Sequence, residues 1–168
     1  MDSHPILNAV EQLVNAARLA KVPIVYSRGE RPKHQAERAL GLDMWGPGLA
    51  HPSITDDDVA IAASLAPHAD DFVIEKVRVS AFYETPLPAL LQKLGRKQLW
   101  VCGVFAHHGV MVSSVEAFMR NYKVQLIADA VADYSEDDHW MALRYIAQTC
   151  GQIQTLQLAL NALRSEPH

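Results

Sequence analysis

The stretch from Leu99 to Phe118 holds the residues whose types and spacing are best suited to chemistry. An apolar run breaks at Gly103, and a helical pattern starts near Gly109. A helix that begins directly after a strand points its N–H groups and the positive end of its dipole at the space beyond the sheet. Such a turn is a ready site for a carboxylate or a developing oxyanion. We therefore expect the chemistry of this protein at the turn before Gly109.

A cation follows a second short apolar run upstream. Residues 71–75 predict a buried strand, and Lys76 stands at its carboxyl end. In open parallel sheets, ligands bind beyond the carboxyl ends of the strands, so Lys76 and the turn at 103–109 are expected to face one crevice. The alternative for Lys76, from its position alone, is an ordinary solvated lysine at the end of a strand.

Histidines and cysteines invite other kinds of chemistry. His107 and His108 are neighbours and point in different directions, and no carboxylate in the sequence pattern completes a ligand set, so we expect structural histidines and no metal. Cys102 and Cys150 are too few for a disulfide framework. Because Cys102 lies within an apolar strand, we expect it to pack as a small hydrophobic side chain.

Composition indicates one ordinary globular domain over residues 1–168. A chain of 168 residues with 49% hydrophobic and 20% charged residues can bury a core without disulfide or metal support. A net charge of −4 without a basic cluster argues against nucleic acid and against an anionic membrane as partners. No apolar run is long enough for a membrane span and the first residues do not form a signal peptide, so we expect a cytoplasmic protein.

The elements that must position the turn and Lys76 alternate between strands and helices. This alternation predicts an α/β fold with a parallel sheet that helices cover on both faces. A long polar, Gly/Pro-rich excursion follows the first strand, with one helical turn near 35–40 and Trp45 as an anchor. Expected strands lie at 23–27, 71–76, 99–105, 123–130 and 152–156, and expected helices at 6–20, 53–66, 86–94, 109–121, 136–150 and 156–164.

Four stretches in order resemble one known family. They are ERALGLDMWGPGL (37–49), KVRVSAF (76–82), the block from Gly95 to Arg120, and ADAVADYSEDDHWMALRYIA (128–147). Together they resemble the isochorismatase branch of the isochorismatase-like hydrolases over most of residues 10–156. The resemblance implies a three-layer α/β/α fold with a Rossmann-like parallel sheet, of which about five strands are matched here.

The resemblance also implies an activity, namely hydrolysis of the vinyl ether of isochorismate to release pyruvate, without metal or organic cofactor. In the family, an Asp at the end of the first strand protonates the vinyl carbon, and burial suits a carboxyl group to this role. Nothing ahead of the helix at 6–20 resembles that strand, and Asp2 does not follow a strand. We therefore expect impaired activity.

The unmatched strand has a structural consequence as well. In the family it lies in the middle of the sheet, between the strands that correspond here to 23–27 and 99–105. Without it, two interior edges keep unpaired backbone groups. We therefore expect a closed-up sheet, low stability, or dependence on a partner.

The implied site residues fall into two groups. Lys76 and the backbone of Gly109 are expected to be catalytic, with Lys76 holding a carboxylate or ether oxygen. Arg38 is expected to bind a substrate carboxylate, the alternative being a salt bridge with Asp43 or Glu37. The family has a Gln near Gly29 and a Tyr at Phe105, so altered specificity is expected. The expected substrate-binding residues are Arg38, Phe105, Gly29, Trp45 and Phe82.

Two other functions stay open beside a hydrolase acting on a small anionic cyclic substrate. The first is a catalytically inactive family member that binds a ligand or a carrier protein. The second is a cysteine amidase of the nicotinamidase type, which Gly109 disfavours because those enzymes have a Cys at this position. By the same resemblance we expect a homo-oligomer.

Overall fold

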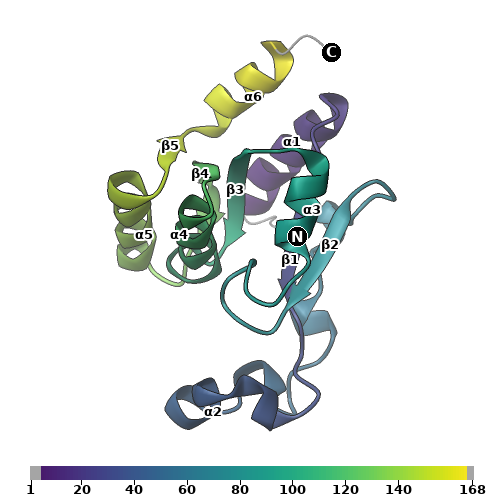
Figure 1. Cartoon of the computed structure of the whole chain (residues 1–168), viewed down its shortest axis with the longest axis vertical. Coiled ribbons are helices and arrows are strands. Elements are labelled where there is room, and N and C mark those ends of the chain that lie inside the picture. Colours follow the sequence, from purple (N-terminus) through teal and green to yellow (C-terminus); the bar gives the residue numbers. More distant parts are fainter. Residues whose placement is uncertain (1–4, 166–168) are drawn as a thin grey trace.

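Strands and helices alternate along most of the chain in a computed structural model, which describes residues 5–165 except the side chains of Pro5, Gln35 and Arg38. Figure 1 shows the strands between the helices. The strands are β1 (Val25–Gly29), β2 (Phe72–Lys76), β3 (Gln98–Val104), β4 (Lys123–Ala132) and β5 (Gln152–Gln154). The α-helices are α1 (Pro5–Leu19), α2 (Leu40–Trp45), α3 (Leu87–Leu94), α4 (Met111–Met119), α5 (Glu136–Thr149) and α6 (Leu156–Ser165).

The five strands form two parallel sheets. β1 pairs with β2, and β3, β4 and β5 pair in that order. The parallel arrangement was expected, but the two groups of strands are not hydrogen-bonded into one sheet, and the sheet has not closed up between β1 and β3. The β3–β4 register shifts between Val101 and Gly103, close to the point where β3 ends.

Helices cover both faces of the strands, which confirms the three-layer α/β/α fold. On one face, α1 and α6 share an apolar cluster with Ile127 and Ala130 of β4. On the other face, α3 and α4 pack over Ile74 and Val124, and α5 packs over Leu126. The apolar stripes that the sequence pattern predicts on these helices are thus buried against the sheets.

The sequence signals at two helix ends have the expected geometry. α3 ends at Gly95, whose φ of 64° is the left-handed conformation that glycine adopts without strain. α5 begins after Ser135, whose hydroxyl accepts a hydrogen bond from Asp138 N at 3.1 Å. Both helices therefore begin or end within one residue of the predicted positions.

The helix expected over 53–66 is wrong. Only two short 3-10 turns form there, at Asp57–Val59 and Ala63–Leu65. The expected cap does form, because the Asp58 carboxylate accepts hydrogen bonds from the backbone N–H and the hydroxyl of Thr55, at 2.7 and 2.8 Å. Neither turn contains a buried residue, so a longer helix here would have no apolar face to bury.

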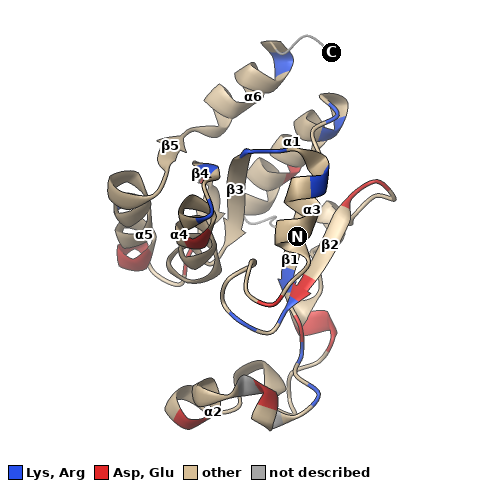
Figure 2. Ribbon diagram, viewed as in Figure 1, with Lys and Arg blue, Asp and Glu red and all other residues tan. Residues whose placement is uncertain are grey.

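Charged residues are spread over many elements in Figure 2, and no basic stripe marks the ribbon. Arg28 of β1 and Glu75 of β2 form an ion pair across the two-stranded sheet, where basic and acidic segments adjoin in Figure 2. Within the described residues, no helix combines the length and apolar character that crossing a bilayer requires.

Candidate active site at the strand ends

Lys76 is the last residue of β2 and lies opposite Gly29 of β1. The chain turns back over it, so that its ammonium donates hydrogen bonds to the carbonyl oxygens of Arg78 at 3.1 Å and Val79 at 2.8 Å. Burial lowers the pKa of Lys76. Among the described residues, no carboxylate forms an ion pair with this ammonium, so its charge is held by carbonyl dipoles alone.

Gly109 lies beside this ammonium. A Cβ atom placed on Gly109 would stand 3.8 Å from Lys76 Nζ and 3.7 Å from the Val79 carbonyl oxygen. The structure thus brings together the two residues that the sequence pattern placed in one crevice. The helix begins later than expected, because a π-helical turn at Ala106–Val110 separates β3 from α4. Single π turns of this kind occur often at functional sites.

The π turn offers fewer open N–H groups than the pattern of a strand followed by a helix predicts. The His107 N–H donates to the Asp133 carboxylate at 2.5 Å. The N–H groups of His108 and Val110 both donate to the Phe105 carbonyl, at 3.1 and 3.3 Å. Three of the donors expected to face a ligand are therefore engaged within the protein.

Sequence reasoning found no carboxylate partner for His107, and this was wrong. His107 Nδ1 lies 2.7 Å from an Asp133 oxygen, and the same carboxylate accepts the Tyr134 N–H at 2.8 Å. Burial alone would raise the pKa of Asp133, but these hydrogen bonds outweigh it and hold the pKa below its usual value. Because β3 and β4 are parallel neighbours, the adjacency of their carboxyl ends was the signal that pointed to this pair.

His108 is a second residue whose position the sequence did not reveal. Burial lowers its pKa, and the positive charges of His107 and Lys76 lower it further. His108 therefore lies within electrostatic range of Lys76 and is neutral at neutral pH. A neutral imidazole beside an ammonium can accept a hydrogen bond from a ligand or donate one to it.

The loop that carries Lys76 is fastened to α4. The Ser80 hydroxyl donates a hydrogen bond to the Glu116 carboxylate, and the Ala81 N–H donates to the Ser113 hydroxyl at 2.9 Å. Ser80 is 6% exposed, so these bonds are shielded from water. They fix the Val79 carbonyl that in turn holds the Lys76 ammonium.

The other expected site residues are less closely gathered. Gly29 ends β1 opposite Lys76, and the Leu49 side chain would lie 3.0 Å from a Cβ atom there. Phe105 stacks on Tyr134, with ring centroids 3.8 Å apart. Phe82 is only 3% exposed and packs in the core against Tyr122.

Two expected substrate-binding residues belong to the excursion after β1. Trp45 lies on α2, which projects from the body of the molecule in Figure 1, and it is 73% exposed. It is therefore not the buried anchor that the sequence suggested. The side chain of Arg38 lies outside the described part of the structure. For both residues, contact with a ligand stays a prediction.

The side chains of His107, Asp133 and Asp138 place possible ligand atoms within 4.8 Å of one another. Protein hydrogen bonds already account for them, because Asp133 binds His107 and Tyr134 while Asp138 accepts the Ser135 hydroxyl at 2.6 Å. This group links the π turn to the start of α5.

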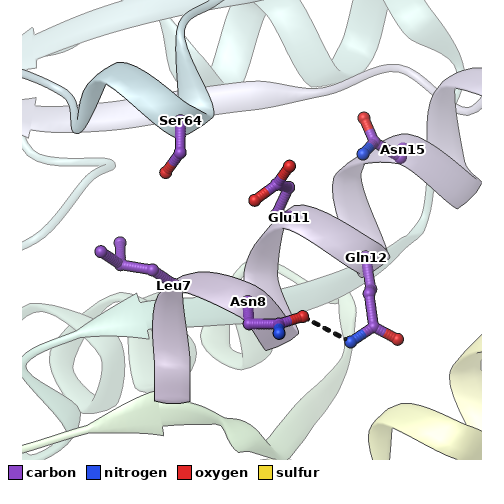
Figure 3. A pocket seen from close by; sticks show the side chains of 6 residues that line it. All are labelled: Leu7, Asn8, Glu11, Gln12, Asn15 and Ser64. Carbon is purple, nitrogen blue, oxygen red and sulfur yellow. Dashed lines mark hydrogen bonds between the residues drawn. The ribbon is translucent and has the colours of Figure 1, made fainter. Parts of the chain in front are cut away.

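The hollows on the surface lie elsewhere. One of about 320 Å³ runs along α1 beside Ser64, and its largely polar lining is drawn in Figure 3, where Asn8 accepts a hydrogen bond from Gln12 at 2.7 Å. A second of about 520 Å³ lies between α1 and α6. Neither is lined by Lys76 or Gly109, so the candidate site is an open edge of the sheets rather than one of these hollows.

Comparison with known proteins adds three kinds of similarity. Residues 1–157 match the family model of the isochorismatase domain. Enterobactin synthase component B of Escherichia coli is 41% identical over 79% of this chain and 45% of its own length, so this chain spans less than half of that relative. Phenazine biosynthesis protein PhzD of Pseudomonas fluorescens is 40% identical over 90% of this chain and 75% of its own length.

Solved structures agree with the fold. An isochorismatase family protein from Burkholderia thailandensis superposes with a TM-score of 0.84 at 26% identity, covering 96% of this chain and 84% of that one. A cysteine hydrolase from Pseudomonas syringae has a TM-score of 0.89 at 24% identity, covering 96% of this chain and 81% of that one, a likeness that concerns the fold alone.

Proposed function

The chain belongs to the isochorismatase family, and from this premise we propose that it hydrolyses the vinyl ether of isochorismate or of a related small anionic cyclic enol ether. The products are pyruvate and the ring alcohol. A similar protein of Bacillus subtilis that carries the name isochorismatase, 37% identical over 94% of this chain and 50% of its own length, supports this substrate class.

The observation that carries the proposal is the Lys76 ammonium. It is partly buried, it is bound only to the carbonyls of Arg78 and Val79, and it stands next to Gly109, which has no side chain to exclude a ligand. An ammonium has three N–H donors, and two of them are used here. A substrate carboxylate or ether oxygen would accept the third and neutralise the buried charge.

The chemistry needs a proton on the terminal vinyl carbon and then water at the neighbouring carbon. Protonation gives an oxocarbenium-like centre, water adds to it, and the resulting hemiketal breaks to pyruvate and the alcohol. Lys76 holds the substrate in place for these steps and is a poor source of the proton, because an acid works best with a pKa near the working pH.

No residue of this sequence matches the aspartic acid that supplies the proton in the family. We therefore propose that hydrolysis by this chain is slower than in a relative by about two to four orders of magnitude, the usual contribution of a general acid. Arg38 is proposed to bind a carboxylate. Gly29, Trp45, Phe82 and Phe105 are proposed to shape specificity.

Pyruvate release from isochorismate tests the proposal. The purified chain is compared with PhzD, with Lys76→Met and with Lys93→Met, which removes an exposed lysine from the last turn of α3. We expect slow release by the wild type and Lys93→Met and none above background with Lys76→Met. Release at the rate of PhzD would contradict the slow rate proposed here, and equal release by the two lysine variants would contradict the role of Lys76.

The alternative of a ligand-binding family member without activity makes a different prediction in the same assay. The wild type would then bind the substrate without releasing pyruvate. The amidase alternative has no supporting observation, because the two cysteines are Cys102 and Cys150, neither at the start of α4. Ammonia release from nicotinamide would nevertheless revive it.

Self-association and a cytoplasmic location complete the proposal. The apolar side chains exposed on the outer helices, among them Met119 at 76% and Trp140 at 58%, are compatible with contact between copies. Sedimentation of the purified protein distinguishes a monomer from a homo-oligomer.

A further inference from the structure

We propose that the space between the edges of β1 and β3 is a docking slot for one added β-strand, an extended apolar segment that a second polypeptide supplies parallel to both. The inference does not depend on the proposed function. Hydrogen bonding, the sharing of the two helix layers and the exposure of the strands each support it.

The backbone of β1 has one paired edge and one open edge. The Ile24 carbonyl accepts the Phe72 N–H at 2.9 Å, and the Glu30 N–H donates to the Lys76 carbonyl at 2.9 Å. In a parallel ladder, alternate residues direct both backbone groups to the same neighbour, so the even-numbered residues of this strand face β2. The residues whose N–H and C=O face the other way are Val25, Ser27 and Gly29.

The backbone of β3 has the matching arrangement. The Lys97 carbonyl accepts the Lys123 N–H at 2.8 Å, so the odd-numbered residues at this end of β3 face β4. No strand within residues 5–165 pairs with the opposite edge. The residues that face it are Gln98, Trp100 and Cys102.

The two open edges belong to one layer of the molecule. Ile24 of the β1 segment and Trp100 of β3 pack against the same cluster under α1 and α6. Val25 and Leu99, whose side chains point to the other face, both pack against the cluster under α3 and α4. A strand between the two edges would have helices on both faces, so its side chains must be apolar on both sides.

Exposure separates these strands from a true interior strand. β4, in the middle of its sheet, has five buried residues, namely Val124, Leu126, Ile127, Ala130 and Val131. β1 and β3 have none, although both are rich in apolar side chains. Open apolar edges with unpaired backbone groups are templates for strand addition.

These observations define the occupant. It is extended, about five residues long to match β1, apolar at successive positions, and parallel to β1 and β3. Among the described residues, each of the five strands already has its place in one of the two sheets. The occupant is therefore sought in another polypeptide.

Addition of a synthetic peptide to the full chain tests the slot. The peptide carries five consecutive Val, Ile and Leu residues between polar flanks, and the control has the same composition with N-methyl groups on alternate residues. Hydrogen exchange is followed amide by amide. We expect the peptide to slow exchange at Val25, Ser27 and Trp100 at least tenfold, and the N-methylated control to have no effect.

A protein variant sharpens the test. Ser27→Pro removes an N–H that faces the slot and leaves the β1–β2 ladder intact, a position where an edge strand tolerates proline. We expect this variant to unfold at nearly the same urea concentration as the wild type and to bind the peptide at least tenfold more weakly. Arg28→Pro, which removes an N–H that faces β2, should instead lower the urea midpoint.

Three results would overturn the proposal. The first is unchanged exchange at Val25, Ser27 and Trp100 in saturating peptide. The second is equal protection by the N-methylated control. The third is protection without peptide that grows with protein concentration, which would mean that two copies pair through these edges.

Discussion

The Lys76 ammonium lies 3.8 Å from the point that a Cβ atom on Gly109 would occupy, although the two residues follow strands of different sheets. Parallel strands end at the same edge of a layer, and both residues stand at that edge. The positive charge and the side-chain-free position thus meet across the gap between β2 and β3, which is why we place the anion site there.

Gly109→Ala should separate ligand binding from stability. The added Cβ meets its neighbours at 3.7 and 3.8 Å, which is ordinary van der Waals contact, and φ at Gly109 is not positive. Alanine in a helical turn is favoured over glycine by about 0.5–1 kcal/mol. We therefore expect unchanged or slightly higher stability in urea, with weaker binding of isochorismate because the methyl group occupies space beside Lys76.

Gly95→Ala is the matched control for this prediction. Gly95 has a φ of 64° at the end of α3, so alanine should lower the free energy of unfolding by about 1 kcal/mol. Its affinity for isochorismate should not change. If Gly109→Ala behaves in the same way as Gly95→Ala, then Gly109 serves the fold rather than a ligand.

Lys76 should make stability depend on pH at the alkaline end. Burial lowers its pKa, so between that lowered pKa and 10.5 the unfolded chain binds more protons at this residue than the folded chain does. Stability contributed by this group therefore rises with pH in that window. Urea unfolding of the wild type and Lys76→Met across the window measures it, and a difference between the two that does not change with pH would contradict the lowered pKa.

Asp133 should act in the opposite direction at the acidic end. Its pKa is held below 3.8 despite its burial, so its contribution to stability is complete above 3.8 and is lost as the pH falls through the lowered value. Asp133→Ala leaves the N–H groups of His107 and Tyr134 without their acceptor, at a cost of about 1–3 kcal/mol each where they are buried. Asp137→Ala, at an exposed position of α5, is the control.

Cys102 should be an unreactive thiol. Its apolar surroundings raise the pKa of Cys102 to about 11. In a Cys150→Ala background, alkylation of Cys102 by a maleimide should therefore keep rising with pH up to about 11. A profile that levels off near 9, the ordinary value, would show that the strand leaves this thiol in water.

Local signals in the sequence were sufficient for most elements. α3 and α5 have glycine or serine at the correct ends and an apolar stripe between them, so both were placed within one residue. The segment 53–66 has the cap without the stripe, which is why a helix predicted from Thr55 and Asp58 does not form. A cap lowers the cost of starting a helix, but burial decides its length.

Relationships between distant residues were harder to predict. The convergence of Lys76 and Gly109 followed from a general rule about parallel strands, and the same rule, applied to β3 and β4, would have paired His107 with Asp133. The engagement of the N–H groups at 107, 108 and 110 depends on the π turn, which no sequence pattern indicated. The division into two sheets is set by which backbone edges have partners, and side-chain patterns do not report that.

The most direct test of the central claim is the affinity for isochorismate of the wild type, Lys76→Met and Lys93→Met, measured by titration calorimetry at neutral pH. A charged hydrogen bond of about 1.5–3 kcal/mol corresponds to a loss of roughly 10- to 150-fold. Our account predicts a loss in this range for Lys76→Met and wild-type affinity for Lys93→Met. Equal affinity of all three proteins would contradict it.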